Sequence, residues 1–216
     1  MLDFMEHMGL DMSKVHELEV GDGDRAHYSK RTIDFEFEFP FGRKELYGCA
    51  YRGDFDLKRH QEVTGVSLEY LDEESGEKFV PHTIEPTFGL DRTILAILTS
   101  AYTEDTRSDE VRPYLKLKPG IAPIICAVSP LLKNKPELVA KAREVFGMLK
   151  LEFGRVMWDD NGKRYRRQDE IGTPWCIVID FDTLENNTVT IRDRDTGEQE
   201  RVPIDELVDF IMERLS

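Results

Sequence analysis

Two hydrophobic patterns divide the chain. Residues 33–39, Ile-Asp-Phe-Glu-Phe-Glu-Phe, alternate apolar and acidic side chains, which is typical of a half-buried antiparallel strand. Further extended segments are predicted at 45–51, 64–70 and 79–84, with a turn at 73–76. From Thr93 onward, apolar residues recur at helical spacing, at Ile94, Ile97, Leu98 and Ala101. The first half is therefore expected to form an antiparallel sheet followed by an amphipathic helix.

Beyond a boundary placed near Arg112–Pro113, the apolar runs no longer alternate. Residues 121–129 and 175–180 are continuous and of strand length, which predicts strands that are covered on both faces. Pro136 opens a predicted helix that Gly154 ends. A short strand at 156–158, a hairpin through 195–197 and a final helix over 204–215 complete the pattern. The prediction is an α+β domain at 1–112 and an α/β domain with a mixed sheet at 113–216.

Charge is distributed unevenly along this pattern. The chain has 29 basic and 43 acidic residues, a net charge of -14, and 25 of the acidic residues lie in 1–112. Because the overall field repels nucleic acid, any contact with it needs a local basic patch. Residues 163–167, Lys-Arg-Tyr-Arg-Arg, place four cations around an aromatic ring that could stack on a base. The alternative is a solvated loop or helix start.

Other classes of protein are disfavoured. No run of about 18 apolar residues could span a bilayer, and the first twenty residues do not resemble a signal peptide, so a cytoplasmic chain without membrane partners is expected. Cys49, Cys126 and Cys176 are odd in number and widely spaced, which predicts buried free thiols. The five histidines lack ligand spacing, so no metal-binding side chains are predicted.

Six segments, spread over both halves, match one family. They are His-Tyr-Ser-Lys at 27–30, Asp-Phe-Glu-Phe-Glu-Phe-Pro-Phe-Gly at 34–42, Glu-Leu-Tyr-Gly-Cys-Ala at 45–50, Arg-Gly-Asp-Phe-Asp-Leu at 52–57, Glu-Pro-Thr-Phe-Gly-Leu-Asp-Arg at 85–92, and 163–174. Together they resemble archaeal-type glycyl-tRNA synthetases, which are class II aminoacyl-tRNA synthetases. The resemblance implies part of the class II antiparallel catalytic sheet at 1–112 and a mixed-sheet anticodon-binding domain at 113–216.

The resemblance also implies a reaction. A glycine carboxylate would attack the α-phosphate of ATP, and the glycyl group would then pass to tRNA-Gly. Arg92, just before the predicted helix, would hold a phosphate together with the helix N-terminus. Glu45 is the second expected catalytic residue and would accept from a donor or help to hold Mg²⁺, although it could instead be an exposed strand residue. The implied ATP-binding residues are Glu45, Leu46, Gly89, Leu90, Asp91 and Arg92.

Glycine has no side chain, so its selection depends on filling nearby space and on capturing its ammonium group. Glu85 is the natural partner of that ammonium. The implied glycine-binding residues are Glu85, Pro86, Thr87, Phe88 and Gly89, and the family usually has serine where this chain has Thr87. The implied tRNA-binding residues are Lys163, Arg164, Tyr165, Arg166 and Arg167.

Two features of the family are not found in residues 1–32. These are the interface signature and the second class II signature, which carries the arginine that grips the α-phosphate. We therefore expect a C-terminal portion that is inactive alone. It would act within a homodimer of the full-length enzyme or with a complementary N-terminal chain, because an incomplete sheet exposes apolar surface and strand edges. The alternative is a non-catalytic tRNA-binding or synthetase-like accessory protein.

Overall fold

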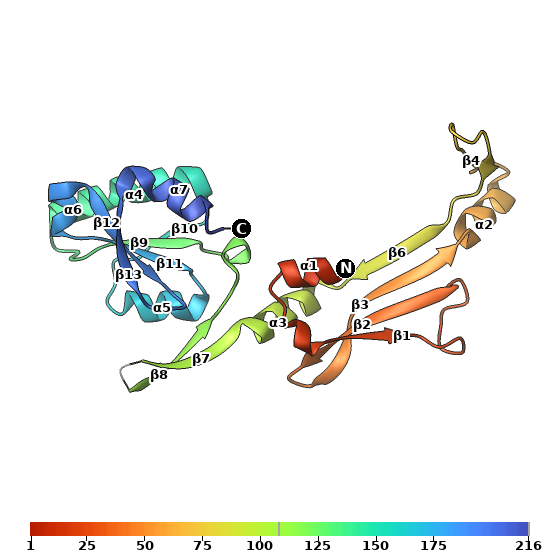
Figure 1. Ribbon diagram of the computed structural model, residues 1–216, viewed down its shortest axis with the longest axis horizontal. Helices are drawn as coiled ribbons and strands as arrows, with labels where there is room; N and C mark the ends of the chain where they lie inside the picture. Colours follow the sequence, from red (N-terminus) through yellow and green to blue (C-terminus); the bar gives the residue numbers. More distant parts are fainter. Residues whose placement is uncertain (108, 216) are drawn as a thin grey trace. The chain divides into compact units, whose positions relative to one another are not determined.

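The computed structural model describes residues 1–107 and 109–215, and the chain divides between Thr99 and Ser100 into two compact units (Figure 1). This division falls thirteen residues before the predicted boundary. Arg112 and Pro113 lie inside β8 (Glu110–Leu115), which forms an antiparallel hairpin with β7 (Tyr102–Arg107). Arg112 also forms a 2.9 Å ion pair with Asp169 of α5 (Arg164–Ile171), so the hairpin belongs to the second unit.

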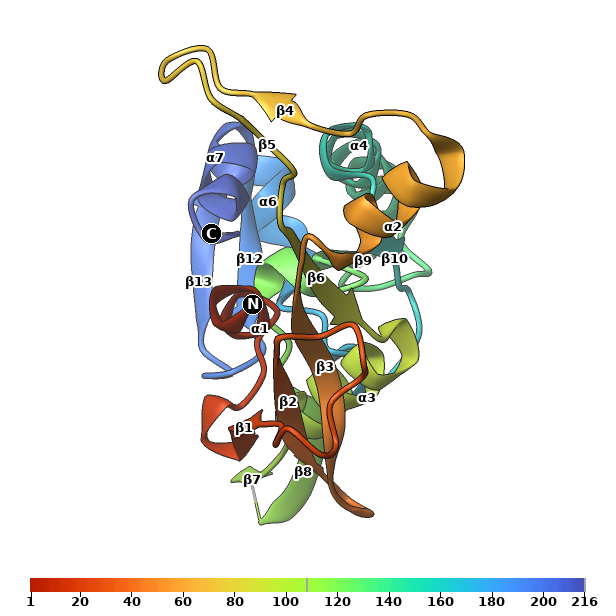
Figure 2. The same ribbon diagram turned by 90° about the vertical axis from the view of Figure 1, so that its right-hand side faces the viewer.

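The first unit is built on a four-stranded antiparallel sheet, seen with its strands side by side in Figure 2. The strand order is β1-β2-β3-β6, and this agrees with the predicted antiparallel sheet. The bounds are β1 Val15–Glu19, β2 Arg31–Phe39, β3 Gly42–Gly53 and β6 Thr83–Phe88.

Alternation along β2 sets the two faces of this sheet. Phe35, Phe37 and Phe39 are buried in the core of the unit, so the acidic residues between them lie on the opposite face. A bulge in β3 moves the pairing from Phe35–Tyr47 to Glu36–Glu45 and leaves Leu46 unpaired. The sheet therefore has one apolar face and one polar face.

Helices and a small hairpin complete the first unit. They are α1 (Leu2–His7), the 3₁₀ turn η1 (Met12–Lys14), α2 (Phe55–Thr64), α3 (Leu90–Ala101), and the hairpin of β4 (Tyr70–Leu71) and β5 (Lys78–Phe79). The predicted amphipathic helix is present as α3. The predicted strand at 64–70 is wrong, because α2 runs to Thr64 and ends at Gly65, whose φ of 70° suits a glycine. The predicted strand at 79–84 is split between β5 and β6.

The second unit contains a mixed five-stranded sheet of order β10-β9-β11-β12-β13, as predicted. Three strands are parallel and the last two are antiparallel. The bounds are β9 Cys126–Pro130, β10 Val156–Trp158, β11 Trp175–Ile179, β12 Thr188–Asp193 and β13 Gln199–Pro203.

Helices lie on both faces of this sheet, as Figure 1 shows for α4 and α7 on one side and α5 on the other. Besides α5, they are α4 (Pro136–Phe153), α6 (Phe181–Asn186) and α7 (Leu207–Met212), with 3₁₀ turns η2 (Pro119–Ile121) and η3 (Ile204–Glu206). The predicted strand at 121–129 begins only at Cys126, and the predicted final helix is η3 followed by the shorter α7.

The thiols and the helices bear on two sequence predictions. Cys126 and Cys176 are buried free thiols, as predicted, whereas Cys49 is only partly buried. Across the described ranges, no helix combines the length and the apolar character that a membrane crossing requires.

Candidate functional site

The polar face of the first sheet gathers several predicted site residues. A Cβ atom placed on Gly48 would lie 3.6 Å from Asp34 Oδ1 and 3.7 Å from Glu45 Oε1, so both carboxylates lie on that face. Thr87 of β6 pairs with Gly48, and Glu85, two residues earlier, pairs with Ala50. Because side chains repeat every second residue along a strand, Thr87 and Glu85 lie on the same face as Glu45.

Glu85 is held by an arginine from the neighbouring strand. Arg52 donates from Nη1 to Glu85 Oε2 at 2.5 Å, and it grips Asp56 with two bonds of 2.6 Å. The hydrogen bonds to Asp56 and then to Glu85 raise the pKa of Arg52 above its already high ordinary value. Glu85 also lines an open hollow of about 490 Å³, together with Asp56, His60 and Pro86. The structure thus places the Glu85 carboxylate beside a cavity, with one oxygen engaged by Arg52.

Arg92 lies in the first turn of α3 and contacts the strand that carries Glu45. Its Nη1 donates to the backbone carbonyl of Glu45. Gly89 lies next to this contact, and a Cβ there would make only ordinary contacts, 3.8 Å from Arg92 Cβ and 3.9 Å from the carbonyl oxygen of Leu46. The two expected catalytic residues, Arg92 and Glu45, are therefore brought together and both are exposed. Leu90 and Asp91 are exposed beside them.

Other predicted residues of this site point elsewhere. Leu46 is 3% exposed in the core, so only its backbone is available to a nucleotide. Phe88 alternates with Thr87 onto the apolar side, where its ring packs 4.7 Å from Tyr47 and 5.2 Å from Phe4. Pro86 lies between Glu85 and Thr87 along the strand and lines the same hollow as Glu85. Glu85 and Thr87 are thus the predicted glycine-binding side chains of β6 that share the polar face.

The polar face is strongly acidic. Burial, then the charges of Glu45 and Glu36, raise the pKa of Asp34 above its ordinary value. Within residues 1–107 and 109–215, no three metal-ligating side chains converge on one point. Glu45 and Asp34 nevertheless suit Mg²⁺, which commonly binds through substrate phosphates and only one or two carboxylates. These residues fit a magnesium ion that a nucleotide would bring with it.

The second unit places its polar residues at the carboxyl ends of parallel strands. β10 ends at Trp158, whose indole packs under the guanidinium of Arg143, 3.6 Å from the ring centre, and against Phe146. Trp158 Nε1 and Arg164 Nε are both enclosed and have no hydrogen-bond acceptor among the described residues. Ligands of open α/β sheets commonly bind at this edge. No motif in the sequence predicted Trp158 or Arg143 as site residues, although the last residue of a short parallel strand is a usable signal.

The predicted basic patch is less open than its sequence suggests. Arg166 pairs with Glu170 at 3.0 Å, and Arg167 pairs with Asp159 at 2.5 Å. Tyr165 is half-buried with the Arg192 guanidinium 4.8 Å from its ring centre, and burial raises its pKa. Lys163 is exposed and adopts a positive φ just before α5. These five residues lie together at the start of α5, but Tyr165 packs inward rather than toward a ligand.

A buried ion cluster fixes α5 in place, and nothing in the sequence pattern predicted it. Asp169 is 1% exposed and accepts from Arg112 at 2.9 Å and from Arg192 at 2.8 and 3.0 Å. Arg112 reaches it from β8 and Arg192 from β12. This cluster therefore joins three distant segments beneath the basic patch.

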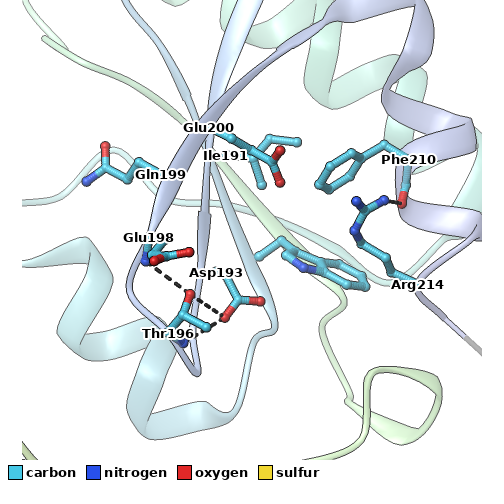
Figure 3. A pocket seen from close by; sticks show the side chains of 9 residues that line it. Ile191, Asp193, Thr196, Glu198, Gln199, Glu200, Phe210 and Arg214 are labelled. Atoms are coloured by element: carbon cyan, nitrogen blue, oxygen red, sulfur yellow. Dashed lines mark hydrogen bonds between the residues drawn. The ribbon is translucent and has the colours of Figure 1, made fainter.

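A hollow of the second unit, of about 310 Å³, has a mostly acidic lining, unlike the basic patch (Figure 3). Asp193, Glu198 and Glu200 line it, against the single cation Arg214. Arg214 donates to the carbonyl of Phe210, and Asp193 accepts from Thr196, as Figure 3 shows. Because carboxylates repel phosphates, RNA is not expected here.

Comparison with known proteins extends this picture. Residues 125–214 match a family model described as an anticodon binding domain, which corresponds to the five-stranded sheet and its helices. The chain is 49% identical to a glycine–tRNA ligase of Clostridium kluyveri over 94% of its length, and 48% identical to that of Clostridium tetani over 99%. It is 52% identical to the glycine–tRNA ligase of Alkaliphilus metalliredigens over 88%.

The similarity covers both units of the chain but only part of each relative. The chain spans 43%, 46% and 41% of the lengths of these three proteins, which is somewhat under half. The matched anticodon binding model lies wholly in the second unit. By sequence, the chain is thus similar over most of its length to part of several glycine–tRNA ligases, and residues 125–214 match an anticodon binding domain.

Proposed function

We propose that this chain acts as part of a glycine–tRNA ligase, which uses ATP to charge tRNA-Gly with glycine. The observation that carries the proposal is the common polar face of Glu45, Thr87 and Glu85, with Arg92 bonded at Glu45. The chain is also homologous to enzymes named for this reaction. Two acidic groups and a guanidinium on one open sheet face suit a substrate with an ammonium group and phosphates.

Each group has a distinct task in this proposal. Glu85 binds the glycine ammonium through Oε1, because Arg52 occupies Oε2. Thr87 lies beside it and limits the room for any side chain on the substrate. Arg92 neutralises an ATP phosphate, with Gly89, Leu90 and Asp91 forming the turn that presents it. Glu45 and the backbone of Leu46 face the nucleotide.

Magnesium would serve the nucleotide in this reaction. It would neutralise phosphate charge, and the carboxylates nearest to it would be Glu45 and Asp34. Burial, and then the charges of Glu45 and Glu36, raise the pKa of Asp34, and a cation would relieve the repulsion among these carboxylates.

The second unit is proposed to bind the anticodon loop of tRNA-Gly. The Arg143–Trp158 stack offers an aromatic and cationic platform at the strand ends, and Lys163 and Arg166 are exposed close by in sequence. Arg164, Tyr165 and Arg167 would support this surface from within, because they contact Pro130, Arg192 and Asp159. Lys163 and Arg166 would then make the phosphate contacts.

Association is part of the proposal. Leu90, Ile94 and Leu98 follow one another at helical spacing on α3 and are 73%, 49% and 41% exposed. An apolar stripe of this kind is typical of a surface that another chain covers. We propose a homodimer of the full-length enzyme or pairing with a complementary chain as the working form. Adenylate synthesis by this chain alone is not expected.

One observation favours a second candidate, a non-catalytic tRNA-binding accessory protein. The Glu85 carboxylate already has a guanidinium partner, so it could be a purely structural acceptor. In that case the second unit would still bind RNA while the first bound no substrate. The two candidates therefore differ in whether the polar face binds a glycyl adenylate.

A titration followed by NMR tests the proposal. A non-hydrolysable glycyl-adenylate analogue is added to ¹⁵N-labelled chain, and weak saturable shifts are expected around Glu45, Thr87, Glu85 and Arg92. Glu85→Gln should abolish the shifts, whereas Glu17→Gln, at an exposed position of β1, should leave them unchanged. Three results would support the accessory candidate instead. They are the absence of shifts, equal shifts with the corresponding alanyl-adenylate analogue, and equal shifts in Glu85→Gln.

A further inference from the structure

β13 is the last strand of the sheet in the second unit, and its outer edge pairs with no strand among the described residues. Its inner edge pairs with β12, and Asp193 N donates to the carbonyl of Glu198 just before the strand begins. Hydrogen-bonded pairs recur at every second residue of antiparallel strands, so the N–H and C=O groups of Gln199 and Arg201 face outward. β13 thus offers a free set of main-chain donors and acceptors.

A groove lies beside this strand, between β13 and α7. It consists of the hollow of about 310 Å³ shown in Figure 3 and a second hollow of about 460 Å³. The two hollows share Glu200, Phe210 and Arg214, so they adjoin. Trp175 and Ile191, which are 4% and 2% exposed, form an apolar floor in the first of them. This β13–α7 groove can therefore take the aliphatic stem of a side chain as well as its charged end.

The lining of the β13–α7 groove is strongly acidic. Its carboxylates belong to Asp193, Glu198, Glu200, Glu206, Asp209 and Glu213. Of its two cations, Arg201 and Arg214, the first is engaged by Asp180 through bonds of 2.7 and 2.8 Å. In the part of the chain that the structure describes, the exposed carboxylates of Glu198 and Glu200 form no ion pair. An occupant with several cations would complement this charge.

Arg214 shows what kind of group the groove accepts. Its guanidinium lies 3.7 Å from the centre of the Phe210 ring, and its Nη1 donates to the Phe210 carbonyl at 3.0 Å. An aromatic face next to carboxylates favours a cation. The Arg214 side chain is 44% exposed, so it can turn toward solvent without disturbing the core. A lysine or arginine of a partner would find the same surroundings.

Other occupants suit the surface less well. A second copy of this chain, paired along the same edge, would bring a second set of acidic side chains into one groove. Nucleic acid would be repelled by the same carboxylates. An extended basic peptide matches both features, because main-chain bonds to a strand edge give affinity while pockets for alternate side chains give specificity.

We propose that the outer edge of β13 binds an extended basic peptide segment of a partner protein as an additional strand, with its lysine or arginine side chains in the β13–α7 groove. The inference goes beyond the proposed function, because none of these residues has a part in the proposed binding of glycine, ATP or tRNA-Gly.

Fluorescence anisotropy of the full chain tests the site with a labelled peptide that alternates lysine and threonine over about nine residues. The double variant Glu198→Gln with Glu200→Gln should weaken binding about fivefold, and Arg214→Gln, which removes a competing cation, should tighten it about threefold. The matched control, Glu152→Gln with Glu185→Gln, changes two exposed carboxylates of α4 and α6 and should alter affinity less than about twofold. Failure of the peptide to bind, or unchanged affinity in the first double variant, would overturn the site.

Methylation of the peptide main chain distinguishes strand addition from attraction by charge alone. One peptide carries N-methyl groups on its lysines and the other on its threonines, so both keep every charge. Only every second residue of an added strand bonds β13, so one of these peptides should bind about tenfold more weakly than the other. Equal affinities of the two, whether high or low, would overturn strand addition, as would equal binding of the unmethylated peptide and spermine.

The anticodon stem-loop of tRNA-Gly separates this inference from the proposed function. The variant Glu198→Gln with Glu200→Gln should bind the stem-loop as the parent chain does. Loss of stem-loop binding in this variant would overturn the groove as a separate site. Failure of the parent chain itself to bind the stem-loop, with peptide binding intact, would contradict the anticodon proposal and support the peptide site on its own.

Discussion

Arg52 and Glu85 are 33 residues apart in sequence and form a 2.5 Å ion pair on the polar face of the first sheet. The bond engages Glu85 Oε2 and comes from an arginine that Asp56 already fixes with two further bonds. A guanidinium held in this way positions the carboxylate, because it restricts the rotamers of Glu85 without occupying both oxygens.

Replacement of Arg52 by lysine should therefore weaken binding of the glycyl-adenylate analogue. A lysine keeps the charge but cannot make the bidentate bond to Asp56, so Glu85 would sample more rotamers. We expect the dissociation constant to rise about fivefold in the NMR titration, with a larger loss in Glu85→Gln. Tighter binding in Arg52→Lys would mean that Arg52 competes with the ammonium instead of orienting its partner.

Replacement of Asp34 by asparagine should stabilise the first unit at neutral pH. Burial and the nearby Glu45 and Glu36 raise the pKa of Asp34, so the folded protein bears a cost for the charged carboxylate above that pKa. The expected gain at pH 7 is about 0.5 kcal/mol in the free energy of unfolding. It should shrink as the pH falls through the folded-state pKa and vanish below the ordinary value of 3.8.

Urea unfolding of Asp34→Asn at pH 7, 5 and 3.5 measures this dependence. Glu73→Gln, at an exposed loop position, is the control and should show no gain at any of the three values. A gain that grows toward acid pH would have the wrong sign and would contradict the account of the acidic face.

Replacement of Asp169 by asparagine should destabilise the second unit strongly. The change leaves the charges of Arg112 and Arg192 without their shared carboxylate, and loss of one partner of a buried ion pair typically costs about 3 kcal/mol or more. The neighbouring Glu170→Gln breaks only an exposed pair with Arg166 and should cost less than about 0.5 kcal/mol. Similar unfolding midpoints for the two variants would refute the role assigned to the buried cluster.

The thiols should differ in reactivity. Burial raises the pKa of both Cys126 and Cys176 to about 12, so almost no thiolate forms at pH 8, and neither sulfur is accessible. Brief treatment of the native chain with N-ethylmaleimide should therefore add one label, at Cys49, and three labels should appear in urea. Mass spectrometry of the peptides checks this, and rapid native labelling at Cys126 would contradict the described core.

Local patterns predicted part of the fold well. The alternation at 33–39 identified β2 and its buried face, because period-two geometry depends only on neighbouring residues. In contrast, α2 has no buried residue, so its sequence carries no apolar stripe and an extended segment was predicted across its end. The hairpin of β7 and β8 is polar along much of its length, so no apolar pattern in this part of the sequence marks the division at 99–100.

The candidate site shows the same limit. Glu85, Arg92 and Glu45 could be named from their motif, but the partners that hold them are remote in sequence. Arg52 reaches Glu85 across a β-bulge between Tyr51 and Gly53, which no local rule indicates. In the basic patch, the pair of Arg166 with Glu170 was foreseeable from its i,i+4 spacing, whereas the inward packing of Tyr165 depends on Arg192 of β12.

A crystal structure of the chain with the glycyl-adenylate analogue would show whether the polar face of the first sheet binds the reaction intermediate. We expect the ammonium nitrogen within hydrogen-bond distance of Glu85 Oε1 and the phosphate mimic beside Arg92, on the polar face that Glu45 and Thr87 share. An analogue bound on another surface, or with its ammonium directed away from Glu85, would contradict the proposed ligase site.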